Sequence, residues 1–208
     1  MSLQILSGQL LVGLINGSFY ALLSLGFAVI FGLLGIINVA QGTFYMLGAF
    51  GSWMLLNYAG IGYWPALILS PVIAGAVGMA LEKTSLGRTL RAATENPQLT
   101  RAFGINVPAL LTFGFGAGVA LAGFAGVLAA PIYSVSPLMG GELVITVFAV
   151  VVVGGMGSIL GAIVTGLGLG VIEGFTKVFY PPGANMVIFV IMFIVLLIKP
   201  AGLLGRER

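Results

Sequence analysis

The sequence lacks cysteine, histidine and aspartate altogether. Without cysteine no disulfide can form, and cysteine usage says nothing about the redox compartment. Without histidine the chain has neither the commonest metal ligand nor the usual general base at neutral pH. It also has no glycine-rich P-loop that could hold the phosphates of ATP. We therefore expect no enzymatic activity, no catalytic residues, no metal and no cofactor in this chain.

Charge is also scarce, since 6% of the 208 residues are charged and 60% are hydrophobic. Soluble domains have about 25% charged residues. The mean hydropathy of +1.19 and the 33 glycines are typical of helices that pack closely in lipid. At roughly 20 apolar residues per crossing, the length predicts an all-α polytopic bundle of about seven spans, forming a single transmembrane domain over residues 1–208. The net charge of +3 is too small and scattered to indicate nucleic-acid binding.

Polar and proline-glycine turns separate the predicted spans, and the basic residues orient them. No basic segment precedes the first apolar run, so we expect that run to be a span and not a cleaved signal. With seven crossings, Lys83, the arginines of residues 84–105 and the basic C-terminus share one side, which the positive-inside rule makes cytoplasmic. The N-terminus is then outside. The spans are expected at about 7–34, 37–56, 65–81, 107–130, twice within 142–178, and 186–198.

The stretch 142–178 is too long for one span, and the sequence GGMGS at 154–158 divides it. Two crossings are expected there, with a broken or re-entrant helix as the open alternative. Glu142 is either an ion or proton relay or, as we favour, a charge placed at the positive end of a helix dipole. Glu173 and Lys177, four residues apart, are expected to form an ion pair near the outer interface.

Uncharged polar residues stand at the head of the second span: Asn38, Gln41 and Thr43. Hydrogen-bonding groups of this kind could line a translocation path. They could equally join helices or start one, as is common in membrane bundles. Both interpretations stay open. Small residues recur every fourth position in the fourth span, which predicts a close helix contact through Gly114, Gly118, Ala122 and Gly126.

The segment 84–105, TSLGRTLRAATENPQLTRAFGI, is a polar island in an otherwise apolar chain. Arg88, Arg91, Arg101 and Glu95 alternate with apolar residues, and Pro97 separates two short helical pieces. Such a segment could merely fix the topology. It could also be an amphipathic element that docks into the groove of a soluble partner.

Several of these motifs together resemble the permease subunits of branched-chain amino-acid ABC transporters. They are GSFYALLSLGFAVIFGLLGIINVAQGTFYMLGAF at 17–50, FGINVP at 103–108, VVVVGGMGSILGAIVTGLGLGVIE at 150–173 and KPAGLLGR at 199–206. The resemblance covers nearly the whole chain. It implies a multi-pass protein of the bacterial inner membrane that works with ABC ATPase subunits, a second permease subunit and a periplasmic substrate-binding protein, ATP being bound by the ATPase partner.

The same resemblance implies that segment 84–105 is the cytoplasmic loop that couples the permease to its ATPase. The positions that match the coupling pattern, together with the nearby basic residues, are Arg88, Arg91, Ala92, Ala93, Glu95 and Gly104. The chain departs from the family in two places. Gln41 and Thr43 stand where the family usually has histidine and glutamate, and roughly two spans are missing between Lys83 and Thr84.

Three hypotheses about function follow. The first is an importer subunit for branched-chain or related amino acids. The second is a self-contained channel or secondary transporter, and the third is a shortened form that inserts but does not transport. In the first, the second permease subunit is either another copy of this chain, in a homodimer, or a related chain, in a heterodimer.

Overall fold

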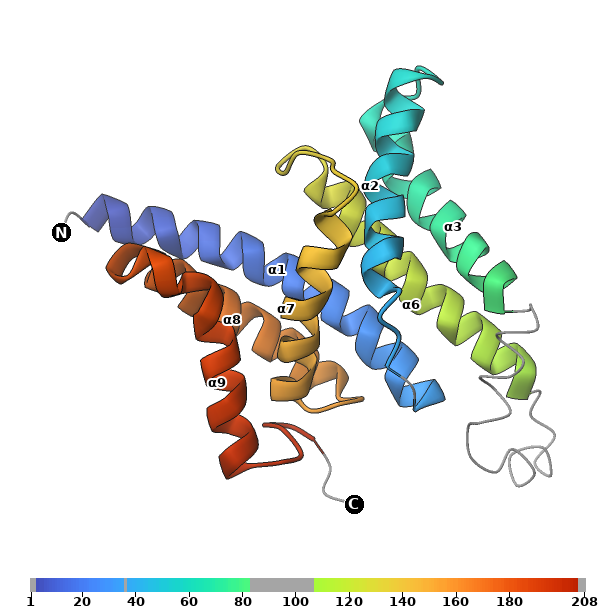
Figure 1. The fold of residues 1–208 in the computed structure, drawn as a ribbon. Coiled ribbons are helices and arrows are strands. Elements are labelled where there is room, and N and C mark those ends of the chain that lie inside the picture. Colours follow the sequence, from blue (N-terminus) through green and yellow to red (C-terminus); the bar gives the residue numbers. More distant parts are fainter. Residues whose placement is uncertain (1–2, 36, 83–106, 206–208) are drawn as a thin grey trace. The chain divides into compact units, whose positions relative to one another are not determined.

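The computed structural model describes residues 3–35, 37–82 and 107–205, and all regular structure in these ranges is helical. Figure 1 shows the helices, coloured from blue at the N-terminus to red at the C-terminus. The helices are α1 (Leu3–Leu34), α2 (Gln41–Asn57), α3 (Tyr63–Glu82), α6 (Val107–Ala129), α7 (Met139–Gly154), α8 (Ile159–Phe179), the 3₁₀ helix η1 (Pro181–Gly183) and α9 (Ala184–Ile198).

The helix boundaries follow the apolar runs of the sequence closely. Within the described ranges, five helices are long and apolar enough to cross a membrane: α1, α3, α6, α8, and α9 extended by η1. α7 is apolar but shorter, with 16 residues, and α2 has 17. At 1.5 Å per residue α7 is about 24 Å long, somewhat less than the roughly 30 Å of a bilayer core. The chain is an all-helical polytopic membrane protein.

The ambiguous stretch 142–178 forms two helices with a sharp turn between them. α7 ends at Gly154 and α8 begins at Ile159, as the GGMGS sequence predicts. The Ser158 side chain caps α8 by accepting a hydrogen bond from the Gly161 N–H at 3.0 Å. This satisfies one of the backbone donors that a helix start leaves without a partner.

The chain divides into two compact units. The first comprises residues 1–28 and 141–208, and the second comprises residues 29–140. α1 contributes its first part to the first unit, and α7 contributes all but its first two residues.

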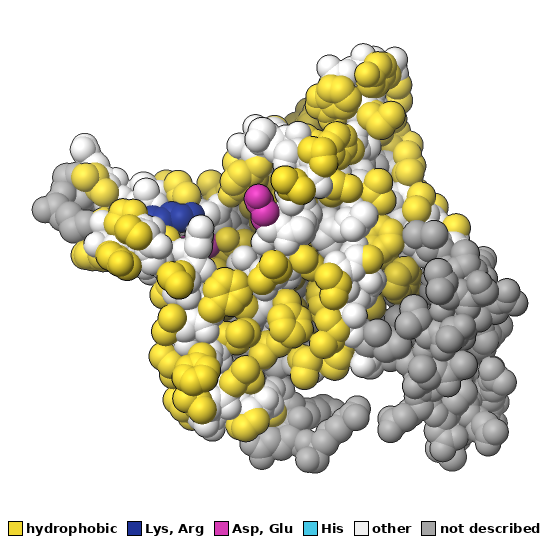
Figure 2. All heavy atoms as spheres, in the orientation of Figure 1, with side chains coloured by type: hydrophobic (Ala, Val, Ile, Leu, Met, Phe, Trp, Pro, Cys, Tyr) yellow, Lys and Arg dark blue, Asp and Glu magenta, His cyan; other side chains and the backbone are white. Residues whose placement is uncertain are grey.

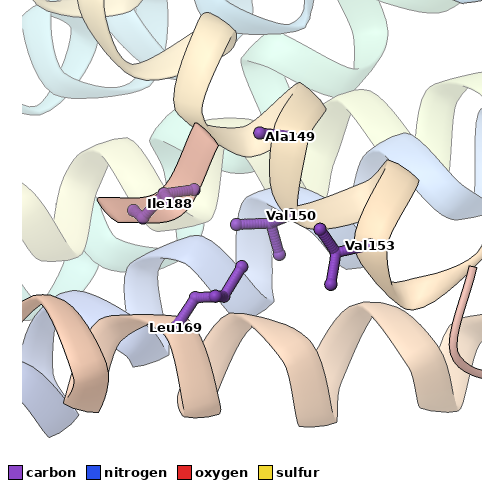
Figure 3. Close-up of a cluster of buried hydrophobic side chains, with 5 residues drawn as sticks. All are labelled: Ala149, Val150, Val153, Leu169 and Ile188. Carbon is purple, nitrogen blue, oxygen red and sulfur yellow. The ribbon is translucent and has the colours of Figure 1, made fainter. Parts of the chain in front are cut away.

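The core of the first unit lies where α7, α8 and α9 meet. Figure 3 shows its buried side chains, which come from all three helices: Ala149, Val150, Val153, Leu169 and Ile188. Phe27 of α1 also contacts Phe148 of α7, with ring centroids 6.5 Å apart. These contacts are apolar packing, which in lipid depends on close van der Waals fit.

α1 and α8 pack backbone to backbone through small residues. A Cβ atom at Gly170 would collide with the backbone of Gly17, and one at Gly166 would lie 2.6 Å from the nitrogen of Ala21. A Cβ at Gly174 would lie 2.7 Å from the carbonyl oxygen of Gln9. Contact therefore moves toward the N-terminus of α1 as α8 proceeds, so the two helices are antiparallel.

The C-terminal segment returns to the turn between α7 and α8. The backbone N–H groups of Leu203 and Leu204 donate to the carbonyls of Val153 and Gly154, at 2.8 and 3.1 Å. They thereby pair carbonyls that the end of α7 would otherwise leave open. Gly155 and Gly202 meet at this point with φ angles of +101° and +80°, a conformation that favours glycine.

The second unit is built from α2, α3 and α6, which pack together through glycines. A Cβ at Gly48 of α2 would collide with Gly123 of α6. A Cβ at Gly123 would in turn lie 2.8 Å from the Cβ of Ala74 on α3. The hydroxyl of Ser70 on α3 donates to the Gly48 carbonyl at 2.7 Å, which joins α3 to α2.

The surface of the molecule matches its composition. Hydrophobic side chains predominate on the face in Figure 2, with few lysine and glutamate side chains among them. The side chains of α9 illustrate this, since Phe193, Leu197 and Ile198 are all exposed. A surface of this kind suits lipid.

Candidate functional site

The polar residues at the head of α2 take different positions. Asn38 lies just before the helix, where its Oδ1 accepts from the Ala40 N–H at 3.1 Å and so forms a turn. This turn is the reason that the helix begins at Gln41 and not at 37 as expected from hydropathy. Thr43 is exposed, whereas the Gln41 side chain is completely buried.

Gln41 joins α2 to α6. Its Nε2 donates to the carbonyl oxygen of Gly118 at 2.9 Å. Its other polar atom, Oε1, is buried without a hydrogen-bond partner. Tyr45, one helical turn further on, is also fully buried, and its hydroxyl likewise has no partner. The sequence interpretation included Gln41 and missed Tyr45, although the spacing of four residues could have indicated a shared helix face.

The α6 stripe of small residues lies partly on this interface with α2. Gly118 accepts the hydrogen bond from Gln41, and Ala122 is fully buried. A Cβ at Gly126 would collide with the carbonyl oxygen of Tyr45. Gly114 is partly buried. The structure also shows a second close contact that the four-residue pattern did not predict, in which a Cβ at Gly116 would collide with Met79 of α3.

Glu142 lies in the first turn of α7, and its side chain is exposed. This is where the positive end of the helix dipole stabilises a carboxylate. The position matches the structural role that we favoured over an ion or proton relay.

Glu173 is buried in α8 and holds two partners. Lys177 Nζ lies 2.6 Å from Glu173 Oε1, which is the expected pair four residues apart. The hydroxyl of Tyr20 on α1 donates to Glu173 Oε2 at 2.7 Å. No local pattern in the sequence indicates Tyr20, which is 153 residues away. The carboxylate therefore links α8 to α1 as well as to its own helix.

The proposed coupling segment, 84–105, lies outside the described residues. The same holds for its individual positions: Arg88, Arg91, Ala92, Ala93, Glu95 and Gly104. Within the described part of the chain, no cluster of histidine, cysteine, aspartate or glutamate could hold a metal ion.

Comparison with known proteins identifies the family. The family model described as "Branched-chain amino acid transport system / permease component" matches residues 9–82 and 79–197. The chain belongs to this family. It is therefore a permease component of a transport system, a role that suits its all-helical, apolar architecture. No solved structure matches it significantly.

Curated relatives carry the same designation. The high-affinity branched-chain amino acid transport system permease protein BraD of Pseudomonas aeruginosa is 27% identical over 294 positions, covering 96% of each chain. The probable branched-chain amino acid transport permease protein LivH of Methanocaldococcus jannaschii is 31% identical over 161 residues, which cover 74% of this chain and 51% of the relative. LivM of Salmonella typhimurium is 37% identical over 62 residues, 30% of this chain and 15% of the relative.

The relatives also contain a part that this chain lacks. The alignment with BraD spans 294 positions, whereas this chain has 208 residues, so many positions of BraD have no counterpart here. The two segments matched by the family model meet at residues 79–82, the end of α3. Both findings agree with the expected internal gap after Lys83.

Proposed function

We propose that this chain imports branched-chain or related amino acids across the bacterial inner membrane, as one permease subunit of an ATP-driven importer. The observation that carries the proposal is the family match on both sides of the internal gap, at residues 9–82 and 79–197. The names of BraD and LivH supply the substrate class.

Partners would supply energy and substrate. A separate ATPase would bind ATP and dock on residues 84–105, where Arg91 and Glu95 offer charges in an otherwise apolar chain. A second permease subunit would complete the path, and the short match to LivM supports a heterodimer of related chains. A periplasmic binding protein would deliver the amino acid.

The test is leucine uptake into proteoliposomes that contain this chain, its ATPase and permease partners, and the binding protein from the same genome. Arg91→Glu and Glu95→Lys should each insert normally but lose coupling. Because an interfacial charge pair contributes a few kcal/mol, we expect stimulated ATP hydrolysis and uptake to fall by about tenfold or more. Arg208→Glu, a charge reversal at the C-terminus, is the matched control and should leave both rates unchanged.

The outcomes separate the three hypotheses. Undiminished coupling in both variants would exclude docking through residues 84–105. Leucine uptake without any ATPase, driven by an ion gradient, would support a self-contained transporter. Membrane insertion without any binding of an ATPase subunit would support a shortened form that does not transport.

A further inference from the structure

Two buried polar atoms on one face of α2 have no partner. Gln41 and Tyr45 expose no surface, and Gln41 Oε1 and the Tyr45 hydroxyl make no hydrogen bond. Residues four apart lie on the same helix face. Among the described residues with such unpartnered atoms, this is the pair that lies one turn apart on a helix. A buried polar group without a partner costs about 1–3 kcal/mol, so two together point to a partner that binds for part of the transport cycle.

The orientation of the Gln41 amide is fixed by its anchor. The Gly118 carbonyl can only accept, so the amide NH₂ must face it, at 2.9 Å. The oxygen is then the atom left over. The hydrogen bond to Gly118 therefore fixes the orientation of Gln41 Oε1, which can accept a hydrogen bond. The Tyr45 hydroxyl, one helical turn away, can donate one. An acceptor and a donor on one helix face complement the ammonium and carboxylate groups of an α-amino acid.

The surroundings suit the rest of such a molecule. Across the interface, α6 presents the small residues Gly118, Ala122 and Gly126, whose backbone approaches α2 closely. On the same interface, the rings of Phe44 and Phe115 meet edge to face, with centroids 6.2 Å apart. The close backbone contacts leave no room between the two helices as they are packed here. Once α2 and α6 separate, the rings and the small residues would offer an apolar surface to a branched hydrocarbon side chain.

We infer that Gln41 Oε1 and the Tyr45 hydroxyl form an amino-acid subsite in the α2–α6 interface, the first binding the ammonium group and the second the carboxylate. This inference rests on the proposed function and deepens it. Since both side chains are fully buried, α2 and α6 must separate before the amino acid enters. The hydroxyls of Ser52 and Ser70 are already bonded to the carbonyls of Ala49 and Gly48, and they stay outside the site.

Tyr45→Phe tests the inference because it removes one oxygen and keeps the ring. The hydroxyl has no partner in this structure, so the variant should melt no lower than the wild-type complex. In the reconstituted importer, leucine uptake at saturating binding protein should fall by about tenfold, the equivalent of ~1.4 kcal/mol. Gln41→Met should show the same loss of uptake. Ser52→Ala, which removes a buried hydroxyl already bonded to the Ala49 carbonyl, is the control that should transport normally.

A binding measurement completes the test. Millimolar L-leucine should raise the melting temperature of the detergent-solubilised wild-type complex, and Tyr45→Phe should abolish the rise. Isoamylamine, which lacks the carboxylate, and 4-methylpentanoate, which lacks the ammonium group, should have little effect. If the wild type imports leucine but Tyr45→Phe changes neither uptake nor the leucine-induced rise, the subsite is wrong while the function stands. If the wild type imports no leucine under ATPase drive, the proposed function falls, and this subsite falls with it.

Discussion

At the scale of single residues, the buried carboxylate of Glu173 is held by partners on two helices, α1 and α8. A charge in a membrane helix is costly and requires a partner. Glu173 has two, the ammonium group of Lys177 at 2.6 Å and the hydroxyl of Tyr20 at 2.7 Å. The ammonium end is partly exposed, at 35% of the side chain, while the carboxylate side chain is 5% exposed. The pair therefore links a partly exposed ammonium group to a buried carboxylate.

Replacement of Lys177 by methionine should leave the Glu173 charge buried with one hydroxyl partner. Breaking a buried pair costs about 3–5 kcal/mol, and the partial exposure of Lys177 reduces our expectation to roughly 1–3 kcal/mol. Glu173→Gln in the same chain should recover most of the lost stability, since it removes the unpaired charge. Thermal unfolding of the two single variants and the double variant in detergent measures the coupling. A double variant no more stable than Lys177→Met alone would contradict this account.

At the scale of helices, glycines allow α1 and α8 to pack with their backbones in contact. The α1–α8 contact depends on Gly13, Gly17, Gly166, Gly170 and Gly174, each of which brings its backbone against the other helix. Without a hydrophobic force between helices in lipid, the association depends on such close packing. A Cβ at Gly168 of α8 would have no atom within 4 Å, so this glycine faces away from the contact.

Gly170→Val and Gly168→Val make a matched pair in one helix. The first inserts a branched side chain where the Gly17 backbone already lies, and the second inserts it into open space. Both substitutions change the intrinsic helix propensity equally. The difference between their free energies of unfolding therefore measures the effect of the α1–α8 contact. We expect Gly170→Val to be less stable than Gly168→Val by about 1–3 kcal/mol or more, the cost of overpacking. Denaturant unfolding in mixed micelles gives the two free energies, and equal values would show that α1 and α8 are not in contact.

At the scale of the whole molecule, the charge pattern predicts the sidedness, and the C-terminal segment shows which helix ends of the first unit lie together. The hydrogen bonds of Leu203 and Leu204 to Val153 and Gly154 bring the chain beyond α9 to the end of α7. α7 and α9 therefore end near each other, as two crossings in the same direction would. If the chain makes the seven crossings expected from its sequence, the positive-inside rule predicts that this shared end is cytoplasmic.

Cysteine labelling tests this topology cleanly because the chain has no cysteine of its own. Ala59→Cys and Ser134→Cys, in exposed connections, should react with a membrane-impermeant maleimide in intact cells. Met156→Cys and Leu203→Cys, also exposed, should react only after permeabilisation. Labelling of Met156→Cys from outside would show that α7 does not cross, and would favour the re-entrant arrangement.

The membrane environment, the helices and the family could all be predicted from the amino-acid sequence. In lipid, an apolar run of about 20 residues must form hydrogen bonds between its own backbone N–H and C=O groups, and a helix does this. The apolar runs of the sequence therefore indicate where the helices lie. The GGMGS break, the Glu142 helix start and the Glu173–Lys177 pair were predicted for the same local reasons, and the structure contains all three. The internal gap was expected from the resemblance to the family.

The contacts between residues that are far apart in the sequence could be identified only from the tertiary structure. Tyr20 contacts Glu173, and the C-terminal segment closes the end of α7, through contacts that no local periodicity encodes. The same holds for the polar residues of α2, where the Gly118 carbonyl fixes Gln41 and the packing against α6 buries Tyr45 while Thr43 faces outward. Burial without a partner is a property of the packed interface, because any of these side chains could be satisfied by water in an isolated helix.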